Sequence, residues 1–206
     1  MATASITHTV GTSQGQVSAS RTLTADGELI KNPTLTAAKT GALTTRTSGT
    51  VGTLTMDTGH GINTADLIDI YWLNADGTRG YRYSCVVGTV ATNSVPFTGG
   101  GGDNLPTLVS GTYAITAKVP QLEPFAYVYT NIVMLNVTSQ YPCQAVFLDG
   151  SNAVLLAVTV DGPSDGYSWD TGSGIANPLS ANVANVRLSH GSSLGSAVVM
   201  AQALIN

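Results

Sequence analysis

Turn-forming residues recur along the whole chain, and this feature constrains the fold more than any other. The turn signals fall at 25–27, 32–33, 76–77, 99–103, 149–150, 161–163, 165–166 and 177–178. The runs between them are rich in Val, Ile, Thr and Tyr, which favour strands. No segment keeps a helical period, and helix is expected only as a short turn near 180–184. The pattern predicts an all-β fold, an antiparallel β-sandwich that is jelly-roll-like.

The clearest local element is a predicted β-hairpin over residues 67–87. In its first strand, 67–73, alternation assigns Ile68, Ile70 and Trp72 to one face and Asp69 and Tyr71 to the other. The return strand is expected to carry Tyr81, Tyr83, Cys85 and Val87 on one face and Arg82 and Ser84 on the other. Further strands are predicted at 54–56 and 113–117, on either side of this hairpin.

The C-terminal third contains more apolar strands. Residues 153–160 are apolar on both alternating faces, which predicts a central strand covered on both sides. Residues 183–188 form another predicted strand. Residues 198–205 are apolar in the same two-sided way, so they are expected to pair within the sheet or against a neighbouring subunit.

A change in composition suggests two domains. Residues 41–118 contain the hairpin and a glycine run, whereas residues 1–40 are rich in Thr and Ser with weak alternation. We expect 1–40 and 119–206 to form one discontinuous sandwich with an N-terminal arm. Residues 41–118 are then a small inserted β domain, barrel-like, because insertions are tolerated where the chain ends of a surface loop lie close together.

Charge is scarce, which excludes several classes of partner. Charged residues make up 10% of the 206 residues, against about 25% in an average domain. The eight Lys and Arg are scattered and the net charge is −4, so no basic surface for nucleic acid or anionic membrane is expected. The N-terminal segment has neither the basic nor the apolar part of a secretory signal. The two cysteines, Cys85 and Cys143, form no CxxC motif and are expected to be buried free thiols, with a disulfide as the alternative.

Several motifs partly match the sequence patterns of chemical sites, and none of them predicts catalysis. The 191–195 segment matches G-x-S-x-G, but no helix pattern and no histidine follow Ser193, so a turn is expected. His190 lies nearby without forming a recognisable dyad. Asp66 with Asp69, and Asp161 with Asp165, resemble carboxylate pairs or a calcium site only loosely. Aspartates in such segments usually stabilise turns.

Three other features also have structural interpretations. His60 lies between two glycines, far in sequence from His8 and His190, and is expected to hydrogen-bond a backbone carbonyl. The glycine run at 99–102 lacks the Lys and Ser/Thr of a phosphate loop and is expected to be a flexible loop tip. Trp72 and Trp169 are expected in core or interface packing, with sugar stacking as the alternative. The sequence predicts no catalytic, cofactor-binding or metal residues.

Two stretches resemble proteins of tailed bacteriophages. Segments 41–56, 59–62, 69–72 and 99–106 resemble a module in uncharacterised proteins of these phages. Segment 169–206, with ANPLSAN at 176–182 and VANVRL at 183–188, is similar to the C-terminal part of small phage virion proteins. Those proteins share a Thr-rich opening like the one at 18–24. The resemblance implies a virion structural protein and carries over no functional residues.

The expected function is therefore that of a capsid decoration or cement protein. It would lie on the outer surface of the phage head, after assembly in the host cytoplasm, and would bridge neighbouring subunits of the major capsid protein. Self-association as a homotrimer is expected, with the N-terminal arm (about 1–20) and residues 41–118 making contacts. The alternatives are a tail tube or head–tail connector subunit and, from another class, a carbohydrate-binding adhesin module that uses Trp72 or Trp169.

Overall fold

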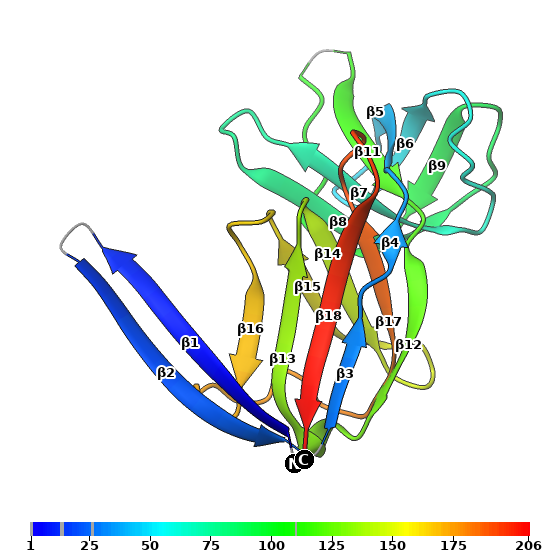
Figure 1. Ribbon diagram of the computed structural model, residues 1–206. Coiled ribbons are helices and arrows are strands. Elements are labelled where there is room, and N and C mark those ends of the chain that lie inside the picture. The colour runs from blue at the N-terminus through cyan, green and yellow to red at the C-terminus, as the bar shows by residue number, and fades with distance from the viewer. Residues whose placement is uncertain (1, 13–14, 26, 110) are drawn as a thin grey trace.

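The computed structural model describes the backbone of residues 2–12, 15–25, 27–109 and 111–206, and the side chains of the last two ranges. These residues are mostly β-strand, with one short 3-10 turn, η1 (Tyr129–Asn131) (Figure 1). The all-β prediction is confirmed. The predicted helical turn near 180–184 is wrong: this segment is extended and enters a strand at Val183, because Leu179 and Val183 both pack into the core. No helix in the described ranges is long and apolar enough to cross a membrane.

Two antiparallel sheets form a sandwich with jelly-roll strand order. The front sheet has the order β16-β13-β18-β3, with the short β4 also on β18, and the back sheet has the order β12-β17-β14-β15. Numbered one to eight along the chain, the eight main strands pair as 1-8-3-6 and 2-7-4-5, which is the jelly-roll order. Their bounds are β3 (Gly27–Lys31), β4 (Thr34–Leu35), β12 (Gln121–Tyr127), β13 (Ile132–Ser139), β14 (Cys143–Leu148), β15 (Val154–Val160), β16 (Tyr167–Asp170), β17 (Val183–His190) and β18 (Ala197–Ile205).

The apolar strands of the C-terminal third take different positions in these sheets. β17 and β18 are interior strands, as expected for their apolar sequences. The prediction that 153–160 is a central strand is wrong, because β15 is the edge strand of the back sheet and Val154 and Thr159 are exposed. Apolar residues on both faces indicate that a strand can be covered on both sides. Whether it pairs with one strand or with two depends on how distant strands are ordered in the sheet.

The strands between β4 and β12 close into a six-stranded barrel. The order runs β8-β7-β11-β5-β6-β9, and pairing of β9 with β8 closes the ring, while the short β10 pairs with β8 further along the same strand. The bounds are β5 (Lys39–Arg46), β6 (Val51–Met56), β7 (Leu67–Leu73), β8 (Arg79–Val87), β9 (Ser94–Thr98), β10 (Gly101–Gly102) and β11 (Tyr113–Lys118). The barrel has its own apolar core, separate from that of the sandwich. The division of the chain at 40 and 118 into folding domains stays a prediction, because strand pairing does not measure independent folding.

A β-bulge changes the faces of the predicted hairpin. The register of β7 and β8 shifts between Ile68 and Ile70, and Ser84 opposite has a φ of 58°. Cys85 and Val87 therefore share a face, as predicted, and belong to the barrel core, whereas Tyr81 lies outside that core and packs edge-on against Tyr71. The expected single face from Tyr81 to Val87 is wrong, since a bulge reverses the alternation beyond it.

The N-terminal strands form a separate ribbon. β1 (Ala2–Thr12) and β2 (Gly15–Ala25) pair with each other over their whole length and with no other described strand. Figure 1 shows this hairpin extending away from the sandwich. The turn residue Asp26 lies outside the described residues, as does the side chain of His8.

Candidate functional site

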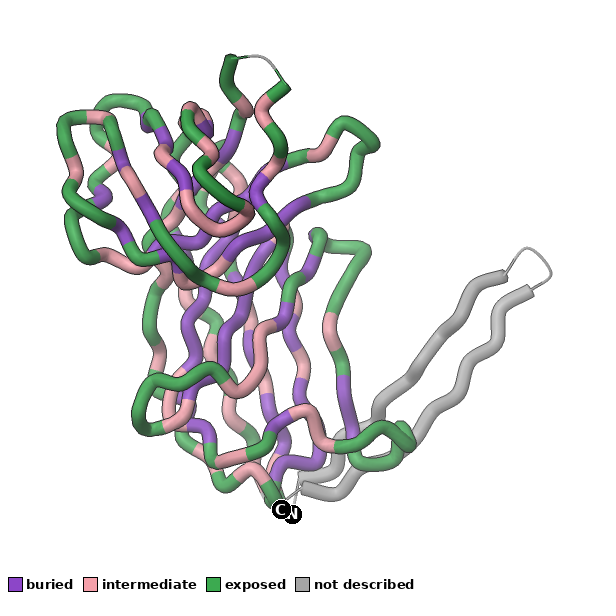
Figure 2. The backbone as a smooth tube through the Cα atoms, turned by 180° about the vertical axis from the view of Figure 1, so that it is seen from behind, coloured by how far each residue is buried: buried purple, intermediate pink, exposed green. Residues whose placement is uncertain are grey.

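The barrel and the sandwich meet at a closely packed junction, which joins residues more than 100 positions apart in the sequence. Figure 2 shows buried backbone continuing from one body into the other. Gly191, just after β17, lies against the Tyr71 ring so closely that a Cβ there would come within 2.5 Å of the ring's Cγ. Thr116 of β11 donates a hydrogen bond to the Gly191 carbonyl at 2.7 Å, and the Ala38 N–H donates to Ser192.

A chain of buried hydrogen bonds crosses this junction. The Ser189 hydroxyl of β17 lies 2.5 Å from the Asp69 carboxylate and 2.5 Å from the Tyr71 hydroxyl, both on β7. Because the single Ser189 proton goes to the carboxylate, Tyr71 must donate to Ser189. The Ser84 N–H also donates to Asp69, at 2.9 Å. These bonds hold β7 against the sandwich in one orientation.

Burial shifts the pKa of both acidic groups in this chain. It raises the pKa of Asp69, while the bonds from Ser189 and Ser84 and the charge of Arg187 act in the opposite direction. Burial, together with the Asp69 charge, raises the pKa of Tyr71 well above its ordinary value. Tyr71 therefore keeps its proton, which it needs as a donor to Ser189.

Two polar side chains of the back sheet reach the junction with buried atoms that lack regular hydrogen-bond partners in the described part of the chain. The amide of Gln144 is fully buried beside the Tyr71 hydroxyl, whose pKa it lowers, and neither amide atom makes a hydrogen bond of regular geometry to a described residue. Arg187 is only 8% exposed, and its Nε is buried without an acceptor. Burial lowers the pKa of Arg187, and the Asp69 charge opposes that shift. Buried polar groups normally find partners, so the Nε of Arg187 is a candidate for contact with something outside the chain.

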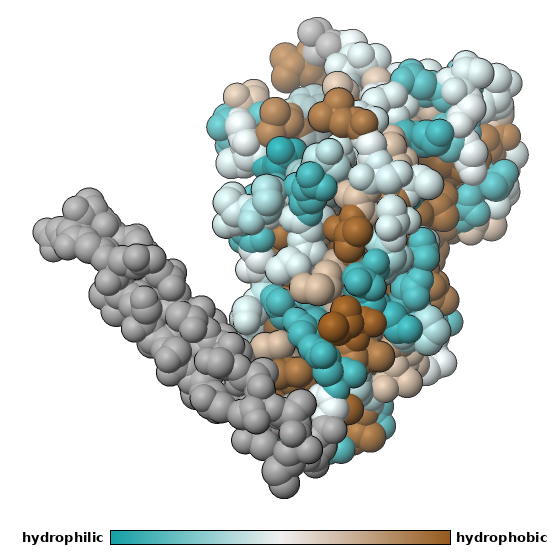
Figure 3. Space-filling model, in the orientation of Figure 1, coloured by the Kyte–Doolittle hydropathy of each residue, from teal (hydrophilic) through white to brown (hydrophobic). Residues whose placement is uncertain are grey.

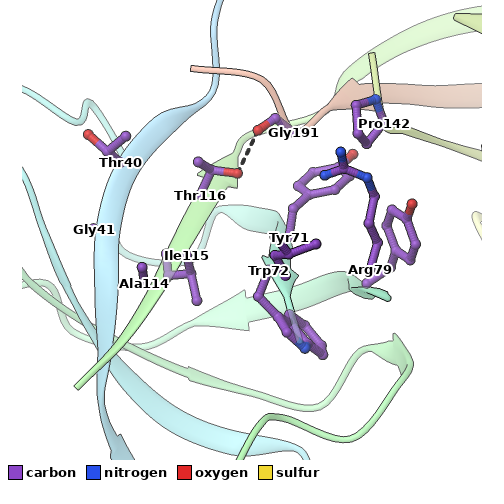
Figure 4. Close-up of a pocket in the computed structure, with 12 residues that line it drawn as sticks. Thr40, Gly41, Tyr71, Trp72, Arg79, Ala114, Ile115, Thr116, Pro142 and Gly191 are labelled. Atoms are coloured by element: carbon purple, nitrogen blue, oxygen red, sulfur yellow. Dashed lines mark hydrogen bonds between the residues drawn. The ribbon is translucent and has the colours of Figure 1, made fainter. Parts of the chain in front are cut away.

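A cleft of about 330 Å³ opens on one side of the junction. In Figure 4 the Tyr71 ring points toward Pro142 and Gly191 of the sandwich, whereas the Trp72 ring points away from them. Arg79 and Thr40 line the same cleft, and their exposed side chains give it a polar rim. The cleft contains no pair of groups arranged for nucleophilic or acid–base chemistry.

His190 and Ser193 are not brought together. The Nδ1 of His190 accepts from the Ser192 N–H at 3.3 Å, so its Nε2 carries the proton and donates to the Leu35 carbonyl at 3.2 Å. Both ring nitrogens are thereby used by backbone groups, and Ser193 is exposed on the following turn. This histidine links β17 to β4 and is not placed to activate a nucleophile.

We expect the stability of the protein to fall as the pH drops below about 6.5. Burial, and to a lesser extent the charge of Lys118, lowers the pKa of His190. The unfolded chain then binds a proton that the fold excludes, so stability is lost with falling pH, by up to about 1.4 kcal/mol per pH unit. Urea denaturation between pH 7.5 and 5 measures this slope. His190→Gln should flatten the slope and His60→Gln should not; an equal slope in His190→Gln contradicts the assignment.

The other candidate residues hold loops together. His60 contacts the Thr92 carbonyl through Nε2 at 3.0 Å, as predicted. Asp165 accepts from the Asp161 N–H and from the Gly166 N–H, and the half-buried Asp66 accepts from the Asn63 N–H. The predicted role of the aspartates in turns is confirmed for Asp165 and Asp66, whereas Asp69 belongs to the junction.

The tryptophans and cysteines lie in the two cores. Each tryptophan is 5% exposed, and its Nε1 donates within the same segment: Trp72 to Asn74 and Trp169 to the Ile175 carbonyl. Neither ring offers an open face for stacking on a sugar. Cys85 and Cys143 are free and buried, as predicted, one in each core. Burial raises the pKa of both thiols to about 12, so neither is a reactive thiolate.

The glycine run at 99–102 is not a free loop tip, so that prediction is wrong. It folds back onto β8, where β10 pairs with Tyr83 and Arg82. Gly100 has a φ of 73°, and a Cβ there would lie 2.3 Å from the Tyr83 carbonyl oxygen. The buried Arg82 guanidinium donates to the carbonyls of Gly99, Gly100 and Asp103 at 2.6–2.9 Å. Glycine was required for this close approach, not for mobility.

The junction cluster of Asp69, Tyr71, Gln144, Arg187 and Ser189 was not predicted from the sequence. The available signal was a polar residue inside each apolar strand, as in LIDIYWL at 67–73 and VRLSH at 186–190. Such residues are expensive to bury unless they are paired. Finding the partners required the three-dimensional arrangement.

No group of three or more metal-ligating side chains gathers within the described ranges. The candidate site is therefore a surface between two bodies, with buried polar groups beneath it. In the comparisons with known proteins, no protein-family model, curated protein or solved structure matches this chain.

Proposed function

We propose that this protein is a virion structural protein that decorates the outside of a tailed-phage head and stabilises it by bridging major capsid subunits. The observation that carries the proposal is the β1–β2 hairpin, whose 11-residue strands pair only with each other among the described strands. An isolated two-stranded ribbon is only marginally stable in water. A ribbon of this length is explained best if it lies on another subunit.

The register of the hairpin supports a docking role. Thr3, Ser5, Thr7 and Thr9 pair with Thr24, Thr22, Ser20 and Ser18, whereas the intervening positions pair Ala4 with Leu23 and Val10 with Val17. Residues that alternate along a strand belong to opposite faces. Positions that pair Ser and Thr thus alternate along the register with positions that carry more apolar residues, a pattern that suits a strand pair covering a partner surface.

The rest of the molecule suits a repeated component of a shell. Jelly rolls occur in viral capsid proteins, and also in lectins and cupins, so the fold admits the proposal without selecting it. Low charge limits repulsion between neighbouring copies. On the front sheet, Ile30 and Val198 are exposed, and Figure 3 shows apolar patches among polar ones on this side.

Gold-labelled antibodies on intact particles, viewed by electron microscopy, test the location. Label over the head supports decoration, label on the tail or neck favours the tube or connector alternative, and absence of label contradicts an accessible decoration protein. Deleting residues 2–25 should abolish cosedimentation with heads stripped of the protein. The urea midpoint of the remaining chain should be unchanged, because β1 and β2 pair with none of its strands. Normal binding of the deletion variant would exclude the hairpin as the docking element.

A further inference from the structure

A second groove, of about 590 Å³, lies between the barrel and the back sheet and shares no lining residue with the cleft beside Tyr71. Its floor is the outer face of the back sheet, and its roof is the barrel, through Leu67 of β7 and Ser84 of β8. The floor residues come from all four strands of that sheet, namely Leu122 (β12), Arg187 (β17), Leu148 (β14) and Val154 (β15). We name this feature the Arg187 groove.

The floor is apolar and open except for one cation. Leu122 is 53% exposed and Val154 is 44% exposed, while Leu148 lies buried between them. Leu122 is the register partner of Arg187, so the two occupy neighbouring positions on one face. Exposed apolar side chains that surround a charged group are typical of a binding surface and not of a surface that contacts only water.

Among the described residues the Nε of Arg187 has no hydrogen-bond acceptor, although the charge of the buried Asp69 carboxylate acts on the guanidinium. In the part of the chain that the structure describes, it forms no ion pair and donates no hydrogen bond. The Oγ of Ser84 in the roof is also buried and unpartnered. A guanidinium donates and a hydroxyl can donate, so the groove holds two buried groups, the Arg187 Nε and the Ser84 Oγ, whose hydrogen bonds are not made within the described residues. Asp66 lies at the rim, and its carboxylate accepts the Asn63 N–H.

We infer that the Arg187 groove receives a short extended segment of another protein, with an Asp or Glu side chain that pairs with Arg187 and apolar neighbours that cover Leu122 and Val154. A carboxylate matches the guanidinium in charge and in planar geometry. Four strands span about 14 Å, which about four extended residues can cross. The identification of the bound protein as a capsid subunit rests on the proposed function, whereas the chemistry of the bound segment does not.

Two peptides test the chemistry. The probes are acetyl-Val-Thr-Asp-Thr-Val-amide, which places both Val side chains on the Asp face of an extended strand, and its twin with Asn in place of Asp. They are titrated into the isotope-labelled full chain and followed by NMR, including the Arg187 Nε–H signal. The Asp peptide should bind saturably and about tenfold or more tighter than the Asn peptide. Equal binding of the two peptides, or no saturable shift at about 5 mM, would overturn the inference.

A variant that supplies the carboxylate within the chain makes the test sharper. Leu122→Glu puts an acid beside Arg187, and cross-strand opposite charges attract. It should preserve or raise the melting temperature and abolish binding of the Asp peptide. Leu73→Glu is the matched control, because Leu73 is 54% exposed but lines the other cleft, and it should bind normally. Undiminished binding by Leu122→Glu would contradict the inference.

Removing the cation separates docking from a structural role. Arg187→Met should still fold, because an apolar side chain of similar length takes the place of the arginine stem. It should also lose the preference for Asp over Asn. If Arg187→Met keeps the preference for the Asp peptide, the assignment is refuted. If Arg187→Met does not fold, normal binding of the Asp peptide by a folded Leu122→Glu refutes it instead. The peptide experiments do not depend on where the protein lies in the particle. If the groove binds the Asp peptide but the antibody does not label phage heads, only the proposed function is rejected.

Discussion

Replacing Arg82 with methionine should lower the free energy of unfolding by about 3–5 kcal/mol. Arg82 is 2% exposed and donates to three carbonyls of the 99–103 segment. Without it, these carbonyls stay buried with no donor, and the segment that covers one side of β8 is no longer held. Urea denaturation measures the loss, and amide hydrogen exchange should show that it is concentrated in β8, β9 and β10.

Arg79→Met is the control for this prediction. Arg79 belongs to the same strand but is exposed, so its replacement should change stability by less than about 0.5 kcal/mol. If Arg82→Met cost no more than the control, the guanidinium would not be what holds the glycine run against the barrel. Protection lost evenly through the sandwich as well would indicate that the two bodies unfold as one unit.

Replacing Gly191 with alanine should destabilise the junction by about 2–4 kcal/mol. The new Cβ would overlap the Tyr71 ring, which cannot retreat without breaking its bond to Ser189. We expect the barrel to separate from the sandwich more readily. Trypsin should then cleave faster at Lys39 and Lys118, which lie where the chain enters and leaves the barrel.

Gly195→Ala provides the matched control, because a Cβ there meets no atom within 4 Å. Its stability and its cleavage rate at both lysines should match those of the unsubstituted chain. Cleavage of Gly191→Ala at the control rate would mean that the junction absorbs the methyl group and that Tyr71 is not a rigid contact.

The sequence predicted the parts of the fold that depend on neighbouring residues. Turn residues and alternation identified the hairpin at 67–87, the all-β class and the jelly-roll-like sandwich with a barrel. The local contact of His60 with a backbone carbonyl and the buried free thiols of Cys85 and Cys143 were also predicted, because each depends on residue type and immediate surroundings.

The errors arose where distant segments decide the outcome. The two apolar faces of 153–160 gave no information on which strands would pair with it, and β15 became an edge strand. The bulge at Ser84 could not be inferred from alternation, so Tyr81 was assigned to the wrong face. The glycine run is not a mobile loop tip because Arg82, about 18 residues away, donates hydrogen bonds to its carbonyls. No local pattern in the sequence indicates this contact.

The sequence by itself determined the secondary structure class, the position of most turns and the content of the two cores, because hydrophobic alternation and turn propensity are local properties. Only the tertiary structure decided the junction. The bond between Ser189 and Asp69 joins residues 120 positions apart. The Nε of Arg187 is buried, with no acceptor among the described residues, only because the barrel covers this part of the back sheet. Burial and pairing are properties of the assembled fold, so a polar residue within an apolar strand acquires its role only there.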